Sequence, residues 1–151
     1  MVPHVEWEKS YHARKRASEE FVKRALRSDH KKALCAMTVD QLVELFLEIA
    51  LAQDETLHWD QYGKYSRLFG MMNKVEAELK SRPGDQRRAL VPLFKHQNAQ
   101  VRVKAAIRAL AVAPGAARQT LQNISDWNEY PQAADARGIL MGLDDGSYKP
   151  D

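Results

Sequence analysis

The chain has 151 residues, a length that suits one domain with a single hydrophobic core. Hydrophobic residues make up 44% of it and charged residues 28%, which excludes a low-complexity composition. Cys35 is the one cysteine, so an intrachain disulfide is excluded. The sequence offers neither an apolar run long enough to span a bilayer nor a signal-peptide core at the N-terminus. We therefore expect a cytoplasmic protein.

The net charge of +3 is unevenly distributed along the chain. Residues 1–36 contain nine Lys or Arg and five Asp or Glu, whereas residues 37–151 contain fourteen and fifteen. Residues 7–27 have a helical pattern with a thin apolar side. The basic side chains of this pattern that could contact an anionic partner are Arg14, Lys15, Arg16, Lys23, Arg24 and Arg27. The sequence predicts a basic helical extension over residues 1–36 and a helical domain over residues 37–151.

The domain begins with two predicted helices. A capping-box pattern at Thr38 and Gln41 favours a helix that runs to about Leu57. Asp60 is a plausible N-cap for the next helix, which Pro83 and Gly84 should end. Apolar residues recur every three or four positions in both segments, which is typical of amphipathic helices.

Two aromatic residues stand at the junction between these helices. Trp59 and Tyr62 continue the apolar pattern on either side of Asp60. We expect both side chains to belong to the core.

The next pair of helices has the most characteristic pattern of the chain. Asp85 should cap its first helix, Pro92 should bend that helix, and Asn98 should cap the partner. The partner reads Val-Arg-x-x-Ala-x-x-x-Ala-Leu from Val101, which is typical of a HEAT-type hairpin. We expect Arg102 to form an ion pair between repeats, with Asp135. Such hairpins stack into binding surfaces more often than catalytic ones.

A third pair completes the predicted domain. Pro114 suits the first turn of one helix, and Pro131 should start the last. Residues 127–130 should form the loop between them. A weak repeat with a shift of 33 residues aligns Val101, Ala105 and Leu110 with Ala134, Gly138 and Leu143. This alignment predicts that Ala134 and Gly138 point inward.

From about residue 37 to residue 150, the chain resembles a family of small bacterial proteins known as a domain of unknown function with a HEAT-like fold. The residues that carry this resemblance are Leu42-Val43-Glu44-Leu45-Phe46, Ala50-Leu51-Ala52-Gln53-Asp54, Lys64-Tyr65-Ser66-Arg67-Leu68-Phe69, the run from Glu78 to Arg88, the run from His96 to Ala106, Pro131-Gln132-Ala133, and Leu143-Asp144-Asp145-Gly146 to Lys149-Pro150. The resemblance implies an all-α superhelix and no established activity, so it supplies no catalytic residues. We therefore predict an all-α, HEAT-like α-α superhelix of about six helices with the basic extension.

The sequence contains no pattern of catalytic residues. Nucleophile-elbow and zinc-ligand spacings are absent, so we expect no enzyme activity, cofactor or metal. Asp54, His58 and Asp60 could offer metal donors, although capping and surface ion pairing are the simpler interpretation. Cys35 follows two lysines that could lower its pKa, but a small, partly buried side chain is the simpler expectation.

Two groups of residues are candidate binding sites. The first is an arginine cluster, defined as Arg82, Arg87 and Arg88, which could hold an anionic group unless it pairs with Glu76, Glu78 and Asp85. The second is the loop pair Trp127 and Tyr130, since aromatic side chains often anchor interfaces. The alternative for this pair is that both side chains fold back on the hairpin.

These features favour a non-catalytic protein-binding module, such as an adaptor or an immunity-type protein, whose partner is another protein. The alternative is a nucleic-acid-binding protein that uses the basic N-terminal helix and the arginine cluster. No small-molecule substrate is suggested by the sequence.

Overall fold

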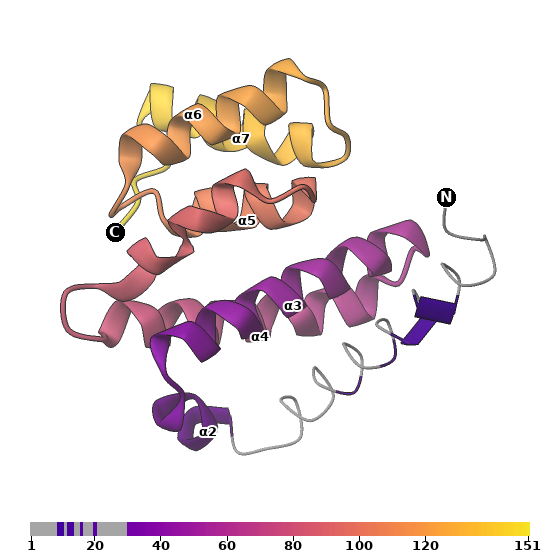
Figure 1. The fold of residues 1–151 in the computed structure, drawn as a ribbon. Coiled ribbons are helices and arrows are strands. Elements are labelled where there is room, and N and C mark those ends of the chain that lie inside the picture. The colour runs from indigo at the N-terminus through magenta and orange to yellow at the C-terminus, as the bar shows by residue number, and fades with distance from the viewer. Residues whose placement is uncertain (1–8, 11, 14–15, 17–19, 21–29) are drawn as a thin grey trace.

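The computed structural model describes residues 9–10, 12–13, 16, 20 and 30–151. Over residues 30–151 the regular elements are all helical (Figure 1). They are α2 (His30–Ala36), α3 (Val39–His58), α4 (Tyr62–Ser81), the 3-10 helix η1 (Gln86–Lys95), α5 (Ala99–Arg108), α6 (Pro114–Asp126) and α7 (Gln132–Asp145). The all-α prediction is therefore confirmed, and the six elements from α3 onward match the expected number.

These six elements form three consecutive helical pairs that stack on one another. In Figure 1, α3 and α4 form one layer, α6 and α7 form the opposite layer, and α5 lies between them. The turns that close the three pairs, at residues 59–61, 96–98 and 127–131, gather at one end of the stack, which we name the turn end. A side-chain hydrogen bond of 3.1 Å from Asn98 to Asp54 joins the second turn to α3.

Local sequence signals explain where most helices begin. Thr38 and Gln41 form the expected capping box at the start of α3. The side chain of Asn98 accepts hydrogen bonds from two backbone N–H groups of α5. Pro114 occupies the first turn of α6. The predicted cap at Asp60 was wrong, because Gln61 occupies the N-cap position of α4 and Asp60 has a left-handed φ of 52°.

The first helix of the middle pair differs from the expected bent α-helix. Residues 86–95 form a 3-10 helix throughout, with Asp85 capping its start as predicted. Pro92 lacks the N–H group that an α-helix would use and crowds the preceding turn. The tighter 3-10 winding still places Leu90 and Phe94 in the core.

The core is continuous through all three pairs. Its largest fully buried apolar side chains include Phe46 and Ile49 from α3, Met72 from α4, Leu90 from η1 and Leu121 from α6. Leu34 from α2 is also buried in this core. The helical pairs are therefore joined by one hydrophobic cluster rather than by separate small ones.

A chain of three buried glutamines crosses the stack. The Gln132 amide donates to Gln100 at 3.0 Å, and the Gln100 amide donates to Gln53 at 3.1 Å. All three side chains are buried, and they come from α7, α5 and α3 respectively. Each carboxamide is hydrogen-bonded to the next. The three glutamines therefore link one helix of every pair through polar contacts inside the core.

Two expectations about burial within the three helical pairs are wrong. Trp59 and Tyr62 are exposed rather than part of the core. Ala134 and Gly138 are also exposed, whereas Ala133, one residue before Ala134, is buried. A shift of one residue rotates the inward face of a helix by about 100°.

Candidate protein-binding surface

The turn end carries four large exposed aromatic side chains. Trp59 and Tyr62 flank the first turn, and Trp127 and Tyr130 belong to the third. Their exposed fractions are 65%, 69%, 66% and 61%. Trp127 and Tyr130 were predicted to lie in a loop, with their exposure left open, whereas Trp59 and Tyr62 were assigned to the core. Trp59 directly follows the last residue of α3, and Tyr62 is the first residue of α4. This position beside a turn is the signal that could have indicated their exposure.

Polar contacts hold three of these side chains in place. The Trp59 indole N–H donates to Glu55 at 3.0 Å, and the Tyr62 hydroxyl donates to Asp60 at 3.2 Å. Arg137 contacts both the hydroxyl and the ring face of Tyr130, with 5.3 Å from the guanidinium carbon to the ring centroid. Ordered aromatic side chains lose less entropy when a partner covers them.

An ion pair braces the third turn against α5. Arg102 binds both carboxylate oxygens of Glu129 at 2.7 Å. The predicted partner of Arg102 was Asp135, which instead lies 3.8 Å from Lys104. Hydrogen bonding to Arg102 lowers the pKa of Glu129 and raises the pKa of Arg102. The bidentate contact fixes the loop that presents Trp127 and Tyr130.

The lowered pKa of Glu129 predicts a pH-dependent contribution to stability. A carboxyl group with a depressed folded-state pKa stabilises the fold above its unfolded-state pKa, and this contribution disappears as the pH falls through the folded-state value. Glu129→Gln should therefore lower the free energy of unfolding at pH 7, by about 1–2 kcal/mol. The difference from the native chain should shrink as the pH falls below the unfolded-state pKa of a glutamic acid, about 4.3. Urea unfolding followed by circular dichroism from pH 7 to pH 3 measures this, and a difference independent of pH would contradict the assignment.

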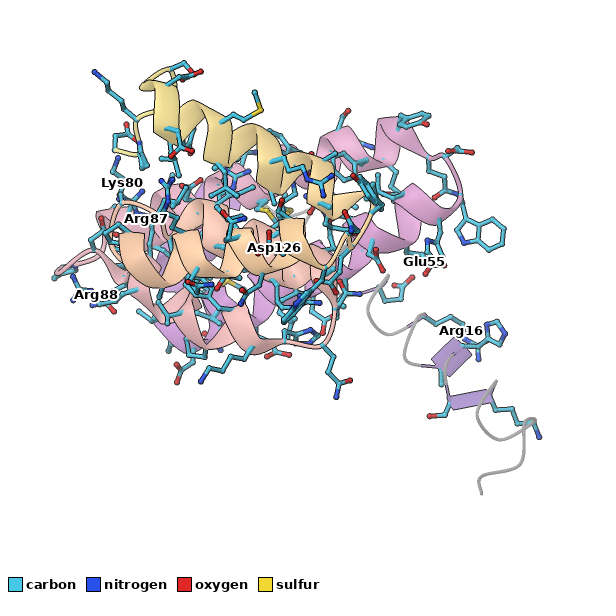
Figure 2. The ribbon with its side chains drawn as sticks, turned by 90° about the horizontal axis from the view of Figure 1, so that it is seen from above. Arg16, Glu55, Lys80, Arg87, Arg88 and Asp126 are labelled. Atoms are coloured by element: carbon cyan, nitrogen blue, oxygen red, sulfur yellow. The ribbon has the colours of Figure 1, made fainter. Side chains whose placement is uncertain are left out.

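The arginine cluster lies at the opposite end of the stack. Figure 2 shows Arg87 and Arg88 at one end of the molecule and Glu55 at the other. Arg82 donates to the backbone carbonyl groups of Leu34, at 3.1 Å, and Met37, at 2.7 Å, and it pairs with Glu78. Arg82 thus joins α2 to the end of α4.

Arg87 also binds other groups of the same chain. It forms a bidentate pair with Asp85, donates at 2.8 Å to the backbone carbonyl of Asp151, and lies 3.8 Å from Glu76. The Arg87 side chain holds the pKa of Asp85 below its usual value. Arg88, by contrast, is exposed. The three arginines therefore do not converge on one point, and two of them hold segments of the chain together.

Two further cationic side chains lie where α5 contacts α4. The Lys104 ammonium lies 5.8 Å and 5.6 Å from the ring centroids of Tyr65 and Phe69. Arg108 contacts the same Phe69 ring and pairs with Glu76. Sequence reasoning did not single out these residues. Their side chains are almost wholly buried, so their contacts stabilise the packing of one helical pair on the next.

The other candidates offer little chemistry. Asp54 accepts its hydrogen bond from Asn98, and within the described part of the chain no group of three or more His, Cys, Asp or Glu could hold a metal ion. The expected partial burial of Cys35 was wrong, because the thiol is exposed, 3.8 Å from Glu78. Arg16 is exposed, and the other candidate cations of the extension lie outside the described residues, namely Arg14, Lys15, Lys23, Arg24 and Arg27. None of the described helices combines the length and apolar character needed to cross a membrane.

Comparison with known proteins identifies the family. A family model described as a domain of unknown function (DUF2019) matches residues 40–144. The chain is also similar to a solved structure, the protein RPA1889 from Rhodopseudomonas palustris, with 47% sequence identity and a TM-score of 0.77. That alignment covers 78% of this chain and 98% of the other. No curated protein matches at a significant level. The predicted resemblance is confirmed, and the chain belongs to the DUF2019 family of domains of unknown function.

Proposed function

We propose that this protein is a non-catalytic protein-binding module whose turn end contacts the partner. The observation that carries the proposal is the set of four aromatic side chains, each more than 60% exposed, on turns at one end of the stack. Tryptophan and tyrosine are enriched among the residues that dominate binding energy in protein interfaces. Their apolar area is left uncovered by the helical body that holds them.

The scaffold supports such a role. Asn98 bonded to Asp54 and Arg102 bonded to Glu129 fix the turns to neighbouring helices, so the aromatic side chains stand on a rigid frame. Stacked helical pairs commonly present their turns and faces to other proteins, and this HEAT-like analogy is part of the proposal. This function has two forms. One is an adaptor, and the other is an immunity-type protein, which occludes another protein.

Removal of the turn-end aromatics should abolish partner binding. We expect the double variant Trp59→Ala/Trp127→Ala to reduce recovery of a stoichiometric partner by at least about tenfold, because each interface anchor contributes about 2 kcal/mol or more. The measurement is co-purification from native lysate with quantitative mass spectrometry. Stability should change by less than about 0.5 kcal/mol per substitution, because both side chains are exposed.

Met141→Ala provides the matched control, since Met141 is 68% exposed but lies on α7 rather than at the turn end. This control should leave recovery unchanged. Equal loss in both variants, or no stoichiometric protein with the native chain, would overturn the proposal. Recovery of nucleic acid that is lost on adding salt would support the nucleic-acid alternative instead.

A further inference from the structure

Lys104 of α5 has a buried ammonium group that makes no hydrogen bond within the described part of the chain. Its side chain is only 8% exposed, and the carboxylate of Asp135 on α7 lies 3.8 Å from the ammonium. That distance allows an ion pair but is too long for a hydrogen bond. The rings of Tyr65 and Phe69 attract the cation but offer it no oxygen acceptor. The three N–H donors of Lys104 are therefore unused.

Arg108, one turn further along α5, also has an unused donor. Its Nη1 atom donates to Asn73 and Glu76, at 2.5 Å each. Its Nε atom is buried and has no hydrogen-bond partner among the described residues. The guanidinium carbon lies 5.1 Å from the centroid of the Phe69 ring, the same ring that contacts Lys104. Because positions four residues apart share one face of a helix, the unused donors of the two cations lie side by side next to this ring.

The side chains that cover the Lys104 ammonium belong to the surface of the molecule. Phe69 and Asp135 are both exposed. Ala134 and Gly138, which flank Asp135 on the same side of α7, are small and exposed as well. A Cβ atom added to Gly138 would meet no other side chain or neighbouring element within 4 Å. A ligand that moves Phe69 or Asp135 aside therefore reaches the ammonium without disturbing the core.

We infer that Lys104 and Arg108 form a binding site for a carboxylate group supplied from outside the chain. A buried polar group without a hydrogen bond destabilises a fold, most of all when it is charged, so a ligand oxygen that accepts these N–H groups is favoured. Asp135 and Glu76 already balance the two cations, so a singly charged carboxylate fits better than a doubly charged phosphate. The carboxylate belongs to a free organic acid or to an acidic side chain of another protein. The site lies along α5 rather than at the turn end, so it is independent of the turn-end aromatics.

Titration of the full chain with three anions tests this inference. The probes are acetate, the blocked glutamate N-acetyl-glutamate N-methylamide, and inorganic phosphate at a pH where it is doubly charged, all at constant ionic strength. Acetate or the blocked glutamate should shift the backbone amide NMR signals of residues 104–108 in a saturable way. Tighter binding of the blocked glutamate assigns the carboxylate to a protein, and equal or tighter binding of acetate assigns it to a free acid. The absence of a saturable shift with either carboxylate, or tighter binding of phosphate, would overturn the inference.

Three substitutions separate a carboxylate site from an internal ion pair. Lys104→Met keeps the length of the side chain and should weaken carboxylate binding at least about tenfold, because charge-assisted hydrogen bonds are lost. Asp135→Asn removes a competing negative charge 3.8 Å from the ammonium and should tighten binding about threefold to fivefold. The control is Lys74→Met, an exposed lysine on α4, which should leave the affinity unchanged.

Circular dichroism checks the fold of each variant. Asp135 is exposed, so Asp135→Asn decides the question on its own if Lys104→Met does not fold. Equal losses of affinity in Lys104→Met and Lys74→Met would overturn the inference. An Asp135→Asn chain that binds carboxylates no more tightly than the native chain would do the same, because Asp135 would then be the internal partner of Lys104.

Discussion

Gln100→Met is expected to destabilise the protein by about 2–6 kcal/mol. The substitution keeps the volume of the side chain but removes its carboxamide. Gln53 then loses the donor that reaches its side-chain oxygen, and Gln132 loses its acceptor. Both side chains are buried, and each unsatisfied buried group costs about 1–3 kcal/mol. Chemical denaturation of the native chain and the variant measures the difference.

Replacing all three buried glutamines should lower the free energy of unfolding by less than the sum of the three single replacements. The triple variant Gln53→Met/Gln100→Met/Gln132→Met leaves no unpaired amide in this line, so its loss of stability should fall clearly below the summed single losses. Gln122→Met is the control, because Gln122 is exposed and bonds to Asp126 on the surface of α6. Additive single effects would show that the three amides act independently and that the chain is not a unit.

Arg87→Met should have the second large effect on stability, and the same substitution at the neighbouring Arg88 provides the comparison. Arg87 is buried and satisfies Asp85 and the carbonyl of Asp151, so its removal leaves the Asp85 carboxylate without its guanidinium partner, whereas Glu76 keeps Arg108. Breaking a buried ion pair costs about 3–5 kcal/mol, and partial exposure of Asp85 reduces this to about 2–4 kcal/mol. Arg88→Met, one residue further along and exposed, should change stability by less than about 0.5 kcal/mol.

Thermal and urea unfolding of these two variants distinguish a structural arginine from a surface one. The variants have the same change of charge and the same new side chain, so any difference reports the environment of the side chain. Similar stabilities for Arg87→Met and Arg88→Met would contradict the internal role that the contacts assign to Arg87.

Features with a local cause were predictable from the sequence. The caps at Thr38, Asp85 and Asn98 and the proline at the start of α6 depend on neighbouring residues only, and all four occur as expected. The placement of Trp127 and Tyr130 between two helices was also predictable, because Pro131 limits how far the preceding helix can extend. Their exposure was not predictable in this way.

Features set by contacts between distant segments were not predictable in detail. The apolar period continues across Asp60, but the left-handed backbone at that residue turns the chain, and Trp59 and Tyr62 point into solvent. Arg102 had two acids within reach of its helix, and only the path of the loop selects Glu129 over Asp135. The glutamines form a buried line because three separate helices present them at one level, which composition alone does not reveal.

The two helices of the middle pair have equal residue counts but unequal lengths. Ten residues of η1 at about 2.0 Å each span about 20 Å, whereas ten residues of α5 at about 1.5 Å each span about 15 Å. An α-helical form of residues 86–95 would be shorter by about 5 Å, or about one turn. Pro92 therefore sets the reach of the segment that closes the end of the stack opposite the turns.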